Sequence, residues 1–396
     1  MIVSTSPPCS LRVAVVSDFL EERWHSMDLV AHMLLTSLQQ YPGTPMSAAG
    51  VRPPMRLRFS RLPVLGRGRT ARNADRLINR FADYPRYLRS QLSRFDLFHI
   101  VDHSYAHLVH TLPPQRTVVT CHDLDAFQCI LDTASDPRSA LFQAMTHRIL
   151  DGLQRAARVV CVSRATRNEL LAYRLVSPDR LRVVPNCIHP AYSPDDEPAG
   201  RAVIDSLLGP PEPANPELLH VGSTIPRKRI DVLLRVFAEV RKSHRRVRLI
   251  QVGGPFTQSQ QELAGQLGLT ADALIVAPTL DVQALAAVYR RAALLLVPSE
   301  REGFGLPVAE AMACATPVVA SDIPALREAG GAAGSYCPVA DCAAWSRAVI
   351  GLLEERAGQP EDWNVRRQRC AAQARQFSPA GYAKAMLGIY NELDTN

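Results

Sequence analysis

Two glutamates eight residues apart, Glu302 and Glu310, carry the clearest chemistry in the sequence. Gly303, Gly305 and Pro307 lie between them, so one regular helix cannot hold both carboxylates. Proline is tolerated in the first turn of a helix, and the pattern therefore predicts a strand, a glycine loop and a new helix. Glu302 then lies on the loop, and Glu310 lies in the first turns of the helix.

The backbone amides of the loop between the two carboxylates meet at the predicted helix N-terminus. Outward-facing amides at such a position form a ready anion-binding site. One carboxylate can hold sugar hydroxyls and the other ribose hydroxyls, with phosphates on the amides between them. The stretch therefore predicts a nucleotide-sugar site.

Short apolar runs, each followed by a polar or glycine turn and then by helical periodicity, recur along both halves of the chain. The expected strands are Arg12–Val16, Phe95–Val101, Thr117–Cys121, Arg158–Val162, Leu218–Val221, Val247–Val252 and Leu294–Val297. This alternation predicts an α/β protein with parallel sheets covered on both faces. The candidate chemical groups follow these strands, at the carboxyl edge where open α/β sheets bind ligands.

The length of 396 residues predicts two domains rather than one core. We expect an N-terminal domain at 1–195, a proline-rich and acidic linker at 196–216, a second domain at 217–377 and a final helix at 378–396. No apolar run reaches the roughly 20 residues that cross a bilayer. Met1–Ser10 lacks the pattern of a signal peptide, and nine dispersed cysteines fit reduced thiols, so we expect a cytoplasmic protein.

The positive net charge of +7 is concentrated in Val51–Arg94, where twelve arginines accompany two acids. Apolar and aromatic residues are interleaved with the arginines. This pattern fits a surface that docks on anionic lipid, at about 1 kcal/mol for each well-placed basic residue. It also fits a solvated face, because the chain uses 42 arginines and three lysines throughout. We keep both interpretations. The first would place the protein peripherally at the inner membrane face, and we expect no nucleic-acid partner.

The stretch Pro298–Ser321 closely resembles the signature of retaining GT-B glycosyltransferases of the "glycosyl transferases group 1" family, which is family 4-like. The resemblance extends to Leu219–Asp231, to Arg180–Pro194 and to Val118–Asp123. It implies two Rossmann-like domains that face a cleft. The C-terminal domain would bind the nucleotide sugar, the N-terminal domain would take the acceptor, and the final helix would cross back to the N-terminal domain.

The resemblance also implies roles for individual residues. Its catalytic residues would be Glu302, which contacts the donor sugar, His122, which reaches that sugar from the other domain, and Arg227 and Lys228, which pair with the diphosphate. Its donor-binding residues would be Gly222, Ser223, Arg227, Lys228, Val276, Pro278, Glu302, Gly303, Phe304, Gly305, Leu306 and, at the ribose, Glu310. The family's leaving phosphate is thought to take the acceptor proton, so no side-chain base is nominated and no metal cofactor is expected.

Two residues after a predicted strand, Asp102 and His103, are candidates for acceptor contact. Departures from the family pattern lie elsewhere. Ser17–Met27 replaces the usual glycine-rich turn after the first strand, which puts phosphate or acceptor contacts there in doubt. Cys187 and Ala315 replace glycines, and each would cost on the order of 1 kcal/mol if its backbone were left-handed.

These observations predict a retaining glycosyltransferase. It would move a hexosyl unit from a nucleoside-diphosphate sugar to a glycan or lipid-linked acceptor, in cell-surface polysaccharide or glycolipid synthesis. A non-catalytic nucleotide-sugar-binding protein is an alternative, but it predicts erosion of the charged set, which is intact. A nucleotide-sugar epimerase is a second alternative, and it needs acid and base groups near the sugar ring.

Overall fold

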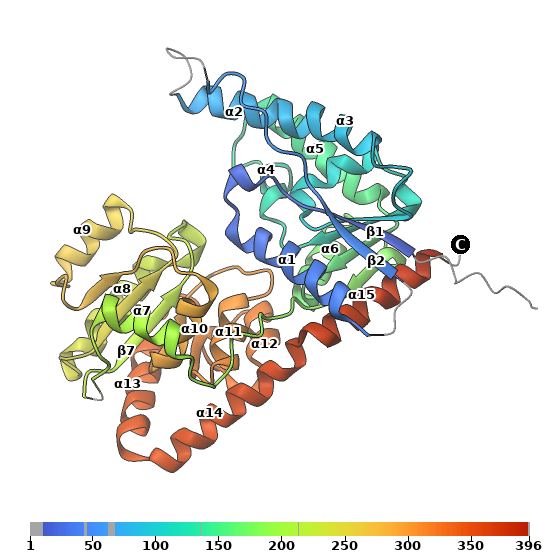
Figure 1. The fold of residues 1–396 in the computed structure, drawn as a ribbon. Helices are drawn as coiled ribbons and strands as arrows, with labels where there is room; N and C mark the ends of the chain where they lie inside the picture. The colour runs from blue at the N-terminus through green and yellow to red at the C-terminus, as the bar shows by residue number, and fades with distance from the viewer. Residues whose placement is uncertain (1–10, 43–45, 62–67, 135, 213, 395–396) are drawn as a thin grey trace, which may run out of the picture. The chain divides into compact units, whose positions relative to one another are not determined.

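The computed structural model describes residues 11–42, 46–61, 68–134, 136–212 and 214–394. It contains two compact units, one formed by Met1–Cys187 with Pro379–Asn396 and the other by Ile188–Ser378. Each unit holds one six-stranded parallel sheet with helices on both faces (Figure 1), which confirms the predicted α/β class. Three sequence expectations fall outside the described residues, those for Met1–Ser10, Cys9 and Arg67.

The sheet of the first unit has the strand order β2-β1-β3-β4-β5-β6. Its strands are β1 (Leu11–Val16), β2 (Met46–Val51), β3 (Leu97–Ile100), β4 (Thr117–Cys121), β5 (Arg158–Cys161) and β6 (Leu181–Val183). All neighbouring pairs are parallel, so the carboxyl ends of the strands share one edge. The central strands are buried on both faces, which is why they read as continuous apolar runs.

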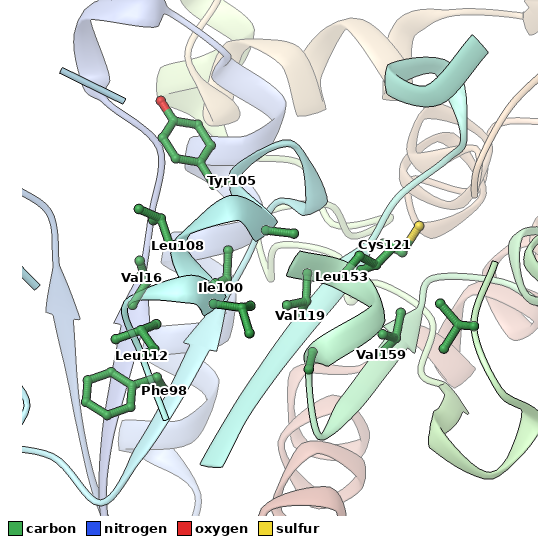
Figure 2. Packing of buried hydrophobic residues seen from close by; sticks show 14 of the residues in the cluster. Val16, Phe98, Ile100, Tyr105, Leu108, Leu112, Val119, Cys121, Leu153 and Val159 are labelled. Carbon is green, nitrogen blue, oxygen red and sulfur yellow. The ribbon is translucent and has the colours of Figure 1, made fainter. Parts of the chain in front are cut away.

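Helices cover both faces of this sheet. They are α1 (His25–Gln40), α2 (Arg69–Ile78), α3 (Tyr84–Arg89), α4 (Gln128–Leu131), α5 (Ala140–Arg155), α6 (Arg164–Ala172) and α15 (Pro379–Asp394). Side chains of α1 and α15 pack on one face, against alternate residues of β1, β3, β4 and β5. Figure 2 shows the other face, where Val16, Ile100 and Val119 lie under side chains of the 3-10 helix His103–His110 and of α5.

The C-terminal helix α15 is tied to the first unit by a buried polar contact. His99 of β3 lies between the Tyr390 hydroxyl, 2.6 Å from its Nδ1, and the Thr120 hydroxyl, 2.7 Å from its Nε2. Burial lowers the pKa of His99 to about 3, so the imidazole is neutral and structural. The helix expected at the end of the chain is therefore present, and its contacts place it with the first unit.

The sheet of the second unit has the order β12-β11-β10-β7-β8-β9. Its strands are β7 (Glu217–Val221), β8 (Arg248–Val252), β9 (Leu274–Val276), β10 (Leu294–Val297), β11 (Val318–Ser321) and β12 (Ser335–Cys337). Every neighbouring pair is again parallel. The edge where β7 and β10 end therefore gathers the loops that carry the predicted donor residues.

The helices of the second unit are α7 (Pro198–Leu208), α8 (Ile230–Ser243), α9 (Gln258–Gln266), α10 (Val282–Arg291), α11 (Leu306–Ala313), α12 (Pro324–Gly330), α13 (Cys342–Gly358) and α14 (Pro360–Ala374). Residues of α8 and α13 form one core with the sheet. Helix α7 lies inside 196–216, the segment expected to be a linker. Pro198 stands in its first turn, where proline favours a helix, and Ile204 and Leu208 are buried.

Candidate functional site

Glu302 lies between two cations of the same unit. Its Oε2 accepts a hydrogen bond from Arg227 at 3.0 Å, and its Oε1 accepts one from Lys228 at 2.5 Å. Only 8% of the Glu302 side chain is exposed, against 19% for Arg227 and 11% for Lys228. Arg227 and Lys228 lie on a 3-10 turn just before α8, and Glu302 follows β10. The structure therefore brings Glu302 into contact with two residues that precede it by 75 and 74 positions in the chain.

The charges of this triad control the protonation of Glu302. Burial alone would raise its pKa, but the Lys228 ammonium and the Arg227 guanidinium hold the pKa below its usual range. Glu302 is therefore a carboxylate at neutral pH, and the triad carries one net positive charge. A buried site with a net positive charge attracts anions, and a diphosphate, which carries more than one negative charge, is attracted strongly.

The loop after Glu302 turns directly into α11, as the sequence predicts. Gly305 is the N-cap with φ 94°, a conformation that favours glycine, and Pro307 stands in the first turn. The Gly305 carbonyl accepts hydrogen bonds from Val308 and Ala309 at 2.9 and 3.4 Å. Phe304 is buried against Phe377 at 5.2 Å, so its backbone rather than its ring is available to a ligand.

Beside Lys228, the loops after β7 and β8 approach each other closely. Gly253 has φ 113°, and a Cβ there would lie 2.5 Å from the Gly222 carbonyl oxygen, so only glycine fits. A Cβ on Gly222 would lie 3.6 Å from Lys228 Cε and 3.5 Å from Nε2 of His220. The Gly222 backbone therefore lies next to the cations. Ser223 and the β9 end, Val276 and Pro278, are exposed at the same edge of the sheet.

His220 is a residue that the sequence analysis missed. It is fully buried, and its Nδ1 donates to the Leu296 carbonyl at 2.9 Å, which leaves Nε2 as an acceptor. No described residue forms a hydrogen bond with that Nε2. Burial lowers the pKa of His220 to about 4. Its position two residues before Gly222 on a buried strand is the only signal that the sequence offers.

Glu310 is separate from the Glu302 triad in its hydrogen bonding. It lies on α11, 5% exposed, and its Oε2 accepts from the Tyr289 hydroxyl at 2.8 Å. Burial raises the pKa of Glu310 to about 7, although hydrogen bonds from Tyr289 and Tyr192 oppose the rise. Glu310 is thus in the first turns of a helix, as predicted, but it is enclosed by two tyrosines that the sequence analysis did not single out.

In the first unit, the predicted residues His122, Asp102 and His103 form one cluster after β3 and β4. The His122 amide donates to Nδ1 of His103 at 3.3 Å, and His122 Nε2 donates to the Val101 carbonyl at 2.7 Å. Asp102 caps the following 3-10 helix, accepting from the Ser104 amide at 2.8 Å and hydroxyl at 2.6 Å. Burial lowers the pKa of His122, so its imidazole is neutral.

Within the described residues, no group of three or more His, Cys, Asp or Glu side chains has the arrangement of a metal site. Among the helices of those residues, none has both the length and the apolar character to cross a membrane. The eight described cysteines are unpaired thiols.

Two family descriptions match the chain. "Glycosyl transferases group 1" matches residues 215–355, and "Glycosyltransferase Family 4" matches residues 12–192. D-inositol 3-phosphate glycosyltransferase from Nocardia farcinica is 36% identical over 54% of this chain and 48% of its own length. The enzyme of that name from Kineococcus radiotolerans is 32% identical over 60% of this chain and 58% of its own length. The chain thus spans about half the length of these relatives.

Solved structures share the fold of the chain. Sucrose-phosphate synthase from Thermosynechococcus elongatus has a TM-score of 0.73 at 20% identity and covers 97% of this chain and 99% of its own. HepE from Anabaena, in complex with UDP and glucose, has a TM-score of 0.70 at 14% identity and covers 96% of this chain and 100% of its own. These likenesses establish the GT-B fold.

Proposed function

The chain belongs to the group 1, family 4-like glycosyltransferases, and on that premise we propose that it transfers a hexosyl unit from a nucleoside-diphosphate sugar to a hydroxyl-bearing acceptor. The observation that carries the proposal is the buried triad in which Glu302 lies between Arg227 and Lys228. The triad stands beside the glycine backbone at Gly222 and the N-terminus of α11, where phosphate oxygens find both cations and amides.

In this proposal the diphosphate lies on Arg227 and Lys228 and the donor sugar lies against Glu302. Both cations then release part of their bonding to Glu302, whose carboxylate turns to the sugar hydroxyls. Each charge-assisted hydrogen bond contributes about 1.5–3 kcal/mol. Such a bond speeds the reaction only to the extent that it strengthens as negative charge develops on the leaving diphosphate.

The nucleoside would extend toward the exposed end of β9, with the base near Val276 and Pro278. We assign the ribose to Glu310 because a carboxyl group in the first turns of α11 offers oxygens to hydroxyl groups. In this chain the Tyr289 hydroxyl already bonds Glu310 at 2.8 Å, so ribose binding requires that the tyrosine yield its place. The two cations supply the positive charge, and we propose that no divalent metal is required.

We assign retention of the anomeric configuration to the reaction. The bond from the anomeric carbon to the phosphate oxygen breaks, the acceptor oxygen bonds to that carbon on the same face, and its proton passes to the leaving phosphate oxygen. This scheme needs no side-chain base. His122, Asp102 and His103 are proposed to serve the sugar and the acceptor from the first unit.

The test is a transfer assay with purified protein, a panel of UDP-, GDP-, ADP- and dTDP-sugars and EDTA in the buffer. Release of nucleoside diphosphate that depends on an acceptor, together with an α-linked product by NMR, would support the proposal. Binding of a nucleotide sugar with no transfer to any acceptor would favour the non-catalytic alternative. A β-linked product would contradict retention.

We keep the anionic lipid surface as the proposed partner of the arginine-rich segment. Arg52 and Arg58 are engaged by Asp28 and Asp83 at 3.0 and 2.7 Å. The surface strip formed by residues 56–61 also carries Arg56 and Arg61, which are exposed. Leu57 and Phe59 of the same strip are each 39% exposed.

The matched test compares two double variants on vesicles with one third anionic phospholipid. Arg56→Glu with Arg61→Glu should reduce binding at least tenfold, because the strip would repel the vesicle surface. Arg86→Glu with Arg89→Glu changes the same charge on exposed residues of α3 and its end, and should change binding less. Equal binding by wild type and both variants would leave the solvated-face interpretation.

A further inference from the structure

The turn after β1 differs from the glycine-rich turn that the family resemblance suggests. Ser17 and Asp18 are followed by Phe19, whose ring is buried 5.1 Å from Tyr84 and 6.3 Å from Tyr105. A 3-10 turn, Leu20–Glu22, comes next. Asp18 is 3% exposed and the Glu22 side chain is 1% exposed, so both carboxyl groups are enclosed by the unit.

Asp18 is a buried carboxyl group without a hydrogen-bond donor. It is 3% exposed, and neither of its oxygens accepts a hydrogen bond from any residue that the structure describes. Its neighbour is the Asp102 carboxylate. Burial, and then the negative charge of Asp102, raise the pKa of Asp18 well above its usual range. Two carboxyl groups this close hold one proton between them.

Other polar atoms around Asp18 also lack partners among the described residues. Glu22 uses only Oε1, which accepts from Arg76 at 3.0 Å, and its buried Oε2 has no donor. Arg80 donates through Nη2 to the Ser104 carbonyl and hydroxyl, at 2.9 Å each, while its Nε has no acceptor. Burial would lower the pKa of Arg80, but Tyr105 and the carboxyl groups of Glu22, Asp102 and Asp18 raise it above its usual value.

His103, which is also buried, completes the set. Its Nδ1 accepts from the His122 amide, so Nε2 carries the proton, and that Nε2 has no acceptor within hydrogen-bond distance among the described residues. The nearest carboxylate, Asp123, lies 3.8 Å from it and is 29% exposed. One Asp18 oxygen shares the proton with Asp102. The cluster therefore presents the other Asp18 oxygen and Glu22 Oε2 as acceptors without partners, and two unpaired N–H groups, on Arg80 and His103.

This mixture of acceptors and donors matches the hydroxyl group, which both donates and accepts. A phosphate dianion offers acceptor oxygens only, and it would meet two N–H groups among several carboxyl groups. We propose that the carboxyl cluster of Asp18, Glu22 and Asp102, with Arg80 and His103, binds neighbouring hydroxyls of an unphosphorylated acceptor. The inference rests on the proposed function and adds the chemical class of the acceptor.

The two curated relatives named above are called inositol phosphate glycosyltransferases, so the inference separates this chain from them by substrate. Leu20, in the turn that carries Glu22, is 60% exposed. The acceptor hydroxyls form the hydrogen bonds that these buried groups lack in the unbound protein. Supplying those missing bonds is a strong source of selectivity for hydroxyl groups.

The experiment uses the full chain and the nucleotide sugar that binds it most tightly. Nucleoside diphosphate release is measured with two matched pairs, myo-inositol against D-inositol 3-phosphate and glucose against glucose 6-phosphate. We expect kcat/KM to be at least tenfold higher for the unphosphorylated member of a pair. A higher kcat/KM for the phosphorylated member overturns the inference. The inference also fails if the nucleotide sugar binds but neither member of a pair acts as an acceptor. Failure of every nucleotide sugar to bind contradicts the proposed function itself.

Variants identify the cluster. Asp18→Asn and Glu22→Gln should each raise the acceptor KM at least fivefold and leave the donor KM unchanged, whereas a structural defect would change both. Asp96→Asn is the matched control, because Asp96 lies in the same unit and pairs with exposed Arg12 at 2.8 Å. If both cluster variants behave like this control, the inference is wrong. If Asp18→Asn does not fold, Glu22→Gln and the wild-type comparison still decide.

Discussion

The protonation of Glu310 gives the second unit a pH-dependent stability that one substitution should remove. Burial raises the pKa of Glu310 from 4.5 to about 7. Between these values the folded protein holds a proton that the unfolded chain has released, so the free energy of unfolding falls as the pH rises. The loss is about 1.4 kcal/mol for each pH unit in this window, or about 2.5 kcal/mol between pH 5 and pH 8.

Glu310→Gln keeps an oxygen for the Tyr289 hydroxyl and removes the titration. Unfolding in urea can be followed by tryptophan fluorescence, because Trp345 and Trp363 are buried in the second unit while Trp24 is 52% exposed. We expect the wild type to lose about 2.5 kcal/mol more than Glu310→Gln between pH 5 and pH 8.

The matched control is Glu354→Gln, which changes an exposed glutamate of α13 in the same unit. The control should follow the wild type at both pH values. Equal losses in the wild type and Glu310→Gln would refute the reasoning, since they would mean that Glu310 does not carry its proton to neutral pH.

Three further substitutions test the donor site. Glu302→Gln should lower kcat/KM about 10- to 100-fold through lost charge-assisted bonds, while Glu300→Gln, two residues earlier on the same loop, should lower it less than threefold. His220 has a buried, unpaired Nε2 beside Gly222, so we expect it to support donor binding. His220→Phe removes this acceptor and should raise the donor KM several-fold with kcat changed less, and His220→Gln should restore part of the loss; equal KM values for all three proteins would contradict this expectation. Gly305→Ala should reduce the free energy of unfolding by about 1–3 kcal/mol, because φ is 94° and a Cβ would lie 2.7 Å from Leu326, and an unchanged urea midpoint would contradict it.

The sequence predicted most of the central strands, which are apolar and buried on both faces, but it did not predict the buried strand β11 (Val318–Ser321). The expected strands at Thr117–Cys121 and Leu294–Val297 coincide with β4 and β10. Strands β6, β9 and β12 were not predicted because each has three residues, and β2 was not predicted because Met46–Val51 is rich in small side chains and lies at the sheet edge. Short edge strands carry too little periodic pattern to be recognised.

The backbone consequences of single substitutions were predicted in part. Ala315, which stands where the family pattern has glycine, does adopt a left-handed conformation with φ 57°. Cys187, the other replaced glycine, is absent from the residues with positive φ. The sequence shows a missing glycine, but only the folded neighbourhood decides whether that position needs one.

The sequence predicted the part of the candidate site that is marked by charged residues in loops after predicted strands. The Glu302, Arg227 and Lys228 side chains meet because their loops leave neighbouring parallel strands at one edge. The partners of Glu310 could not be predicted, since Tyr289 and Tyr192 approach it from α10 and from the loop before α7. Asp102 and His103 were named as acceptor candidates, but Asp18, Glu22 and Arg80 were missed, because their unpaired atoms are defined by packing and not by a motif.

The central claim is that the second unit binds a nucleotide sugar through its cations. Isothermal titration of the UDP-, GDP-, ADP- and dTDP-sugars in EDTA, with the wild type and with Lys228→Met, tests it most directly. The account predicts that one nucleotide class binds the wild type. Lys228→Met should raise the Kd for that nucleotide sugar at least tenfold, because one charge-assisted contact is lost. Binding of no nucleotide sugar, or equal binding by the variant, would contradict the account.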